Sequence, residues 1–301
     1  MNRGAAPHSP PAPDDRLASV RAHDYDRYLS ALLAPADKRM DLMLLYALDA
    51  ELARIPQTVR EPMLAEIRLQ WWRDALAPLL TDTGRGTGAM HRTGHPLADA
   101  FLELARTRAL PAGLIHGLID ARSTDFVDRP LQDKAELWTY LAKTETAILL
   151  LAARILGTQN VPGLDEGAAS AGRAIGLMRL ARRLAAGHAS AEMLTPLTLW
   201  PLDDRHVHPS DAAVEARFTA ARTTALLGLS DLASTELTLA RRRLCPLPGS
   251  LRPAFLPLAL VPRYATHVRR LARGAAMVRD DIHPMVRLWT LWRARRTARL
   301  A

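Results

Sequence analysis

The sequence predicts an all-α fold, and three observations support this. Apolar residues recur every three or four positions through most of the 301-residue chain, which is the helical period. The alternating runs and hairpin turns that mark strands do not occur in the sequence. Aromatic residues make up only 5% of the chain, which disfavours a β-sheet protein. We therefore expect one helical domain of nine or ten helices over residues 14–301, after a disordered, polar segment at 1–13.

Proline and glycine mark the expected helix boundaries in the first half of the chain. Pro35 suits the first turn of a helix, and Pro56 is expected to end that helix. Ile67, Trp71 and Ala75 predict the buried face of the next helix. Four glycines and no apolar period mark residues 81–95 as a loop. The expected helices of this half are Asp14–Leu33, Pro35–Ile55, Val59–Leu80, Leu97–Ala109 and Ala112–Phe126.

Capping residues mark the helices of the second half. Asp133 is a candidate N-cap, and Gly157 and Gly187 are candidate helix ends. Ser210 and Asp211 are expected to cap another helix, after an irregular, proline-containing segment at 193–209. The expected helices of this half are Asp133–Leu156, Leu164–Ala186, a helix ending near Leu244, Ala254–Arg273 and His283–Ala298.

The charge of the chain is strongly basic, with a net charge of +9. Such a charge favours anionic partners, but nearly all the basic residues are arginines, which a GC-rich genome also explains. No nucleic-acid-binding pattern is present, so nucleic acid is not an expected partner. The single Cys245 excludes an internal disulfide and suits a reducing compartment. No apolar run approaches the roughly 20 residues of a spanning helix, so we expect a cytoplasmic protein.

Three sequence blocks carry a resemblance to a known family. They are residues 28–39 with Leu45–Leu48, residues 67–76 with the string Ile-Arg-Leu-Gln-Trp-Trp-Arg, and residues 172–179 followed by Leu194–Pro196. Their order and spacing resemble the squalene/phytoene synthases over residues 20–300. The resemblance implies an isoprenoid-synthase-type helical bundle around a central apolar cavity. Enzymes of this family join two prenyl diphosphates head to head, using magnesium held by two aspartate-rich motifs.

The sequence departs from the family at both positions where the resemblance implies metal ligands. Residues 53–57 read Ala-Arg-Ile-Pro-Gln and residues 183–187 read Arg-Leu-Ala-Ala-Gly, without an acidic side chain. In this the chain resembles an aspartate-less branch of the family, which includes an assembly factor of mitochondrial respiratory complex I. The branch implies a non-catalytic role and no cofactor. The alternative is an active prenyl transferase, which would require magnesium.

Arginines stand where the resemblance implies carboxylates, and two interpretations remain open. Arg54, Arg179, Arg182 and Arg183 either bind an anionic headgroup or diphosphate, or form a structural network with Asp49, Glu51 and Glu66. The candidate cavity-facing residues are Arg39, Asp49, Glu51, Arg54, Arg68, Trp71, Arg179 and Arg183. Asp120, Asp125 and Asp128 gather near a helix end, and we interpret them as caps and solvated charges.

The C-terminal segment combines tryptophans with arginines. Trp289, Trp292, Arg293 and Arg296 are candidate membrane-facing residues, because an interfacial helix on anionic lipid has this composition. A packed terminal helix with a basic outer face has the same composition. The expected partners are a membrane surface or a respiratory-complex subunit, with a prenyl or lipid ligand in the cavity. A peripheral position on the inner membrane is then expected.

Overall fold

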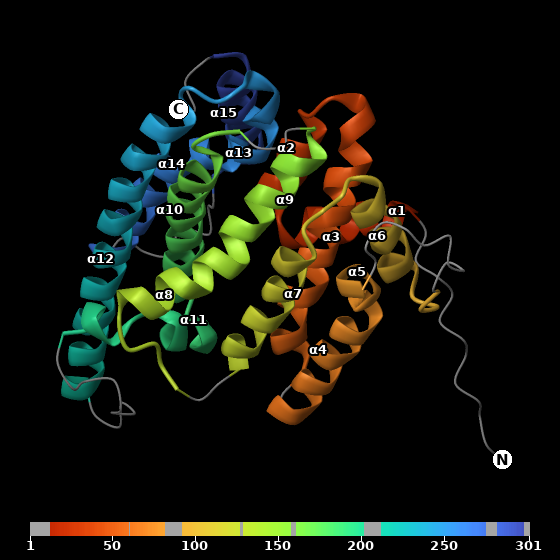
Figure 1. Cartoon of the computed structure of the whole chain (residues 1–301). Coiled ribbons are helices and arrows are strands. Elements are labelled where there is room, and N and C mark those ends of the chain that lie inside the picture. Colours follow the sequence, from red (N-terminus) through yellow and green to blue (C-terminus); the bar gives the residue numbers. More distant parts are fainter. Residues whose placement is uncertain are drawn as a thin grey trace.

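The computed structural model describes residues 13–59, 61–81, 92–126, 129–157, 161–201, 212–274 and 282–297. Every regular element within these ranges is a helix, so the predicted all-α fold class is confirmed (Figure 1). Residues 1–12, most of the expected loop at 81–95, Asp128 and the expected caps Ser210 and Asp211 lie outside the described residues.

The first half of the chain differs from the expectation at several helix boundaries, two of which have a local cause. The predicted first helix breaks at Asp24, whose carboxylate accepts a hydrogen bond from the Arg27 backbone N–H at 3.0 Å and caps a second helix. Pro56 does not end its helix, because the Val59 N–H donates to the Ile55 carbonyl at 3.2 Å and completes a further turn. The helices are α1 (Pro13–His23), α2 (Tyr25–Leu32), α3 (Ala36–Thr58), α4 (Pro62–Leu76), α5 (Pro78–Thr81), α6 (Pro96–Thr107) and α7 (Ala112–Ala121).

In the second half, the three boundaries marked by Asp133, Gly157 and Gly187 fall as predicted, whereas the expected helix Ala254–Arg273 is divided by a 3-10 turn at Leu256–Leu260. Asp133 caps α8 as predicted, by accepting from the backbone N–H groups of Ala135 and Glu136 at 2.8 and 3.0 Å. Gly157 and Gly187 follow helix ends with φ of 96° and 81°, which favours glycine. The helices are α8 (Lys134–Leu141), α9 (Ala147–Ile155), α10 (Leu164–Ala185), α11 (Ala189–Leu194), α12 (Ala212–Leu244), α13 (Arg252–Phe255), α14 (Val261–Ala272) and α15 (Pro284–Arg296).

The predicted face of α4 is wrong at two of its three residues, since only Ala75 is buried. Ile67 is 59% exposed and Trp71 is 40% exposed, whereas Leu69 and Trp72 are buried. Both faces of this helix are rich in apolar residues, so the helical period in the sequence fits either face as the buried one. Only tertiary packing selects between them. The edge of Trp71 packs on Trp72, with ring centroids 5.1 Å apart.

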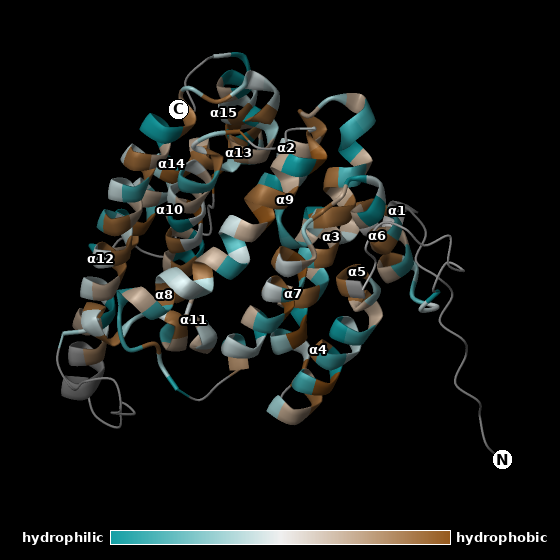
Figure 2. Ribbon diagram, in the orientation of Figure 1, coloured by the Kyte–Doolittle hydropathy of each residue, from teal (hydrophilic) through white to brown (hydrophobic). Residues whose placement is uncertain are grey.

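Helix α10 packs against α12 and α14 and also against a π-helical turn, η2 (Ala142–Thr146); Figure 1 shows it beside α12. The turn joins α8 to α9, so the predicted helix at 133–156 is interrupted. Gly172 of α10 permits the close approach, because a Cβ atom there would overlap Thr146. Hydrophobic residues line the inner sides of the helices (Figure 2). The arrangement leaves α10 and η2 facing α2 and α3 across a cavity.

Candidate functional site

A cavity of ≈ 780 Å³ lies in the bundle. Its wall comes from α3, from α8 with η2, from α10, from the ends of α14 and α15, and from two shorter segments: the α1–α2 junction and the 3-10 turn η1 (Arg122–Phe126). Leucines from α8, α10, α11 and α14 supply part of the apolar surface, and ten charged side chains share the lining with them. The carboxylates are those of Asp24, Asp26, Asp49, Asp125 and Glu145, and the guanidiniums are those of Arg122, Arg179, Arg182, Arg183 and Arg287.

Asp49 is held between two arginines. Arg122 donates to one carboxylate oxygen at 2.5 Å, and Arg27 donates to the other. All three side chains are less than one-tenth exposed. Burial opposes the ionisation of Asp49, but the guanidiniums of Arg122 and Arg27 outweigh it and hold the pKa of Asp49 well below its ordinary range. Asp49 is therefore charged at neutral pH, and both of its oxygens are engaged.

Glu145 extends this cluster across the cavity. The π-helical turn η2 carries Glu145 toward α2, where Arg27 donates to it at 2.7 Å. Arg179 of α10 lies 3.2 Å from the other Glu145 oxygen and also pairs with Asp24. Burial raises the pKa of Asp24, but Arg179 and Arg27 more than reverse the effect, so its pKa is lowered. Ion pairs thus join α2, α3, η1, η2 and α10.

A second cluster ties the C-terminal helix to the cavity. Arg287 of α15 lies 3.2 Å from Asp26, and the Tyr264 hydroxyl donates to the same carboxylate at 2.6 Å. The Arg182 guanidinium stacks 4.0 Å above the Tyr264 ring. Burial and the neighbouring Asp24 raise the pKa of Asp26. The charged form of Asp26 is thus stabilised by Tyr264 of α14 and Arg287 of α15.

The interpretation of Asp125 as a cap or a solvated charge is wrong. Its side chain is only 5% exposed, and it lines the cavity. The Tyr140 hydroxyl donates to it at 2.6 Å, and Arg122 lies 3.5 Å away. Asp120 lies outside the lining and pairs with Arg73 at 2.7 Å.

The cavity residues do not fit the magnesium cluster that the resemblance implies. Magnesium prefers carboxylates that can turn their oxygens to the ion, usually with bound water. Here each of the five lining carboxylates already accepts from an arginine or a tyrosine. Within the part of the chain that the structure describes, no group of three or more His, Cys, Asp or Glu side chains is arranged to hold a metal ion.

The candidate cavity-facing residues divide into two groups. Asp49, Arg179 and Arg183 line the cavity, together with Ala53 and Gln57 from the positions where the resemblance implies metal ligands. The other five lie outside its lining: Arg39 donates to the Ala34 carbonyl, Glu51 pairs with Arg54, Arg68 contacts Thr58, and Trp71 lies on the outer side of α4.

The interpretation of the arginines as a structural network is confirmed for one expected pair. The other residues named in it have different partners from those expected. Arg54 pairs with Glu51 at 2.7 Å, as expected, but this pair is largely exposed. Asp49 pairs with Arg27 and Arg122, Glu66 pairs with Arg73, and Arg183 donates to the Ser190 hydroxyl at 2.6 Å.

Sequence reasoning missed Arg27, Arg122, Asp24, Asp26 and Glu145. One local signal points to Glu145, which lies two residues before the apolar run Ala147–Leu151 on the same helical stretch. A charged residue beside such a run is a candidate for burial with a partner. Arg27 and Asp26 likewise lie among the apolar residues of α2, and both are buried.

Comparison with known proteins places the chain in a family. The sequence matches the squalene/phytoene synthase family over residues 20–290. The structure is similar to squalene synthase of Alicyclobacillus acidocaldarius, with a TM-score of 0.65, 16% identity, and coverage of 87% of this chain and 94% of that one. It is also similar to YisP of Bacillus subtilis, with a TM-score of 0.62, 15% identity, and coverage of 93% and 94%.

Relatives at the sequence level carry a different name. The chain is 28% identical over 181 residues to NADH dehydrogenase (ubiquinone) complex I, assembly factor 6, of Rattus norvegicus, covering 59% of this chain and 52% of the relative. It is 25% identical over 288 residues to the Drosophila melanogaster homolog of that factor, covering 91% and 81%. The chain spans about half the length of the mammalian relatives it matches. The match over residues 20–290 covers most of the sequence, so the chain belongs to the squalene/phytoene synthase family.

Proposed function

We propose that this protein is a non-catalytic accessory factor in the assembly of respiratory complex I. The observation that carries the proposal is the engagement of all five cavity carboxylates by arginine or tyrosine. Head-to-head condensation begins with the loss of diphosphate, whose charge a metal cluster must neutralise. Arginines bound to these carboxylates occupy the oxygens that such a cluster needs.

The relatives support the assembly role. Sequence relatives from mammals, Drosophila melanogaster and Dictyostelium discoideum carry the name of complex I assembly factor 6 or its homolog. The squalene synthases share the fold at much lower identity. We propose on this basis that the partner is a subunit of the respiratory complex, and that the protein acts at the inner membrane in which that complex is built.

The cavity supports a further part of the same proposal, a bound prenyl chain or lipid. Its volume of ≈ 780 Å³ lies in the range of small-molecule pockets. Leu137, Leu141 and Leu180 provide apolar surface in the wall, beside the charged clusters. Native mass spectrometry of the purified protein tests this part, and an adduct with the mass of a prenyl compound or lipid is the expected result.

A deletion strain tests the assembly role. Membranes from the strain are expected to contain less complex I on native gels and less NADH:ubiquinone oxidoreductase activity, and the full-length chain should restore both. Normal levels of assembled complex I in the deletion strain would exclude the proposed function.

The second candidate is an active prenyl transferase, which the shared fold favours. A diphosphate-release assay with magnesium or manganese and a series of prenyl diphosphates separates the two functions. The accessory-factor proposal expects no metal-dependent release, and release with a hydrocarbon product would establish the transferase instead.

A further inference from the structure

The outer side of α15 presents a continuous apolar stripe. Met285, Trp289 and Trp292 are 65%, 58% and 37% exposed, and Leu288 beside them is 37% exposed. Their spacing of three or four residues places them on one face of the helix. The opposite face holds Arg287, Leu291 and Ala294, all buried against the bundle. The stripe is therefore turned away from the protein interior.

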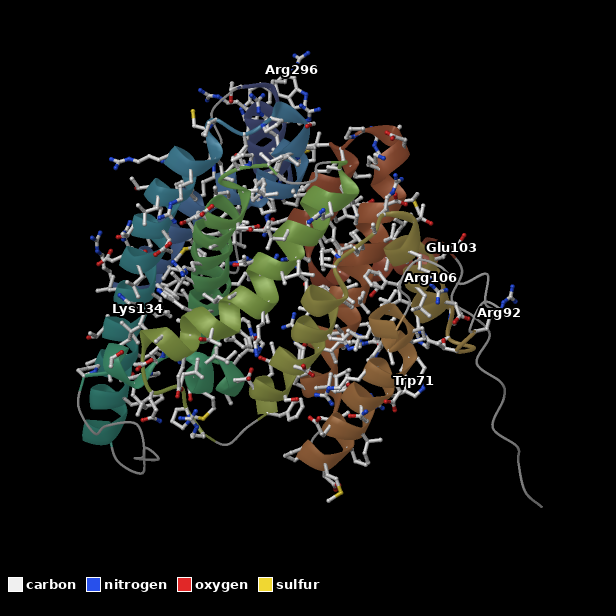
Figure 3. The ribbon with its side chains drawn as sticks, in the orientation of Figure 1. Trp71, Arg92, Glu103, Arg106, Lys134 and Arg296 are labelled. Atoms are coloured by element: carbon white, nitrogen blue, oxygen red, sulfur yellow. The ribbon has the colours of Figure 1, made fainter. Side chains whose placement is uncertain are left out.

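Positive charge surrounds the end of this stripe. Arg293, Arg295 and Arg296 form the last turn of α15, with Arg293 and Arg295 on either flank and Arg296 in line with Trp292. The Arg296 guanidinium lies 4.7 Å from the centre of the Trp292 ring, and Trp292 stacks on Trp289 at 5.1 Å. Figure 3 shows Arg296 projecting beyond the body of the bundle. The sequence from Ile282 to Ala301 contains no Asp or Glu.

We propose that this face of α15 docks on an anionic lipid bilayer. Tryptophan rings favour the boundary between headgroups and acyl chains, and arginines beside them reach phosphate groups with their guanidiniums. The helix would meet the surface along its side, with the stripe toward the lipid and the opposite face still packed on the bundle. No helix of the described residues has both the length and the apolar character to cross a bilayer. The proposal deepens the proposed function, since it names the surface that holds the factor at the membrane.

The chemistry of the face favours lipid over a specific protein partner. The hydroxyl of Thr290 donates to the Val286 carbonyl within the helix, so this donor is not available to a partner. Beyond the guanidiniums, the stripe offers apolar groups, ring faces and the indole N–H groups of Trp289 and Trp292, a combination that suits a fluid headgroup layer. Arg287 anchors the helix from its buried side through Asp26, so the stripe is held by the rigid bundle.

Helix α4 supplies a comparison within the same chain. It also exposes apolar residues, with Met63 at 75%, Ile67 at 59% and Trp71 at 40%. Its flanks are mixed in charge, since Glu61 and Asp74 accompany Arg68 and Arg73. Figure 3 shows Trp71 and Arg296 at distant parts of the molecule. Trp71, an exposed tryptophan in a surround of mixed charge, thus serves as a matched control.

Vesicle co-sedimentation of the full-length protein tests the proposal. The probes are phosphatidylcholine vesicles and phosphatidylcholine vesicles that contain phosphatidylglycerol, each at low and high salt. We expect binding to the anionic vesicles, weakened by salt, and little binding to the neutral ones. Trp289→Ala should lower the binding constant by roughly tenfold, while Trp71→Ala should leave it within about twofold.

Charge reversal gives a second, independent comparison. Arg293→Glu with Arg296→Glu should weaken binding by more than about tenfold, because each arginine near an anionic surface contributes roughly fivefold. Arg242→Glu with Arg263→Glu changes the net charge equally on other exposed helix positions and should have a much smaller effect. Circular dichroism of each variant verifies that it is folded.

Three results would overturn the docking proposal. They are equal binding to neutral and anionic vesicles, equal losses in the α15 variants and their controls, and no vesicle binding together with cross-linking of α15 to an acidic protein. These outcomes are distinct from failure of the assembly role, which normal complex I in the deletion strain would show. In that strain, an α15 variant that loses vesicle binding is expected to restore less complex I than Trp71→Ala.

Discussion

Arg27 and Glu145 stand 118 positions apart in the sequence, yet the Arg27 guanidinium donates to the Glu145 carboxylate at 2.7 Å. The same guanidinium also pairs with Asp49, so one arginine of α2 bridges α3 and the π-helical turn η2. A buried protein cation thus holds together three elements that wall the cavity.

The first prediction concerns the stability that depends on Asp49. Replacing Asp49 with asparagine leaves the buried Arg27 and Arg122 short of one negative charge, which should lower the free energy of unfolding by about 3–5 kcal/mol. Denaturant unfolding followed by circular dichroism measures the change. Glu51→Gln is the control, because its pair with Arg54 is largely exposed and should contribute about 1 kcal/mol or less. Equal effects of the two substitutions would contradict the buried network.

The second prediction is a loss of stability in acid. The pKa of Asp49 is lowered in the folded protein from its ordinary 3.8, so its contribution is complete above that pH and disappears as the pH falls through the folded pKa. The pKa of Asp24 is also lowered, so its contribution to stability is lost in acid in the same way. Asp26, whose pKa is raised, acts with the opposite sign and offsets part of the loss.

Denaturant unfolding at a series of pH values measures this acid loss. The free energy of unfolding of the wild type should fall steeply below about pH 4. The side-chain amide that Asp49→Asn introduces does not titrate, so the curve of this variant should be flatter in the same window. Parallel curves would show that Asp49 does not carry the pH dependence.

Local chemistry explains which parts of the fold the sequence could predict. Asp133, Gly157 and Gly187 mark helix boundaries through groups within a few residues of each boundary, and all three predictions are confirmed. The face of α4 could not be predicted in this way, because apolar residues lie on both of its sides and tertiary packing selects Leu69 and Trp72.

The sequence predicts the candidate site only in part, for a related reason. Asp49 is a candidate because the resemblance gives its helix a position beside the cavity, and Arg179 because it lies near the second expected motif. Arg122 and Arg27 could not be named as candidates from the sequence. The Arg122–Asp49 pair spans 73 positions, and the Arg27–Glu145 pair spans 118. No sequence spacing encodes contacts of that range. From the sequence alone, an arginine on a helix is expected to be exposed to solvent, because its buried partner is not known.

The third prediction concerns the packing of α10 on η2. Gly172→Ala should destabilise the protein by about 1–3 kcal/mol, because the added methyl group overlaps Thr146 and forces the two elements apart. The matched control is Gly117→Ala in α7, where an added Cβ meets nothing within 4 Å. That change should raise stability by up to about 1 kcal/mol, as alanine favours helix. Thermal unfolding compares the two, and a stabilising Gly172→Ala would contradict the close approach.

The last prediction addresses the positions where the resemblance implies metal ligands. Ala53→Asp places one carboxylate in the cavity wall, where Ala53 now lies. A metal cluster needs ligands on both sides of the cavity, and the opposite side holds Arg183 and the arginine-bound Glu145. The variant should therefore remain without metal-dependent diphosphate release from geranyl, farnesyl or geranylgeranyl diphosphate. An active squalene synthase verifies the assay, and turnover by Ala53→Asp would show that the cavity keeps the rest of a working metal site.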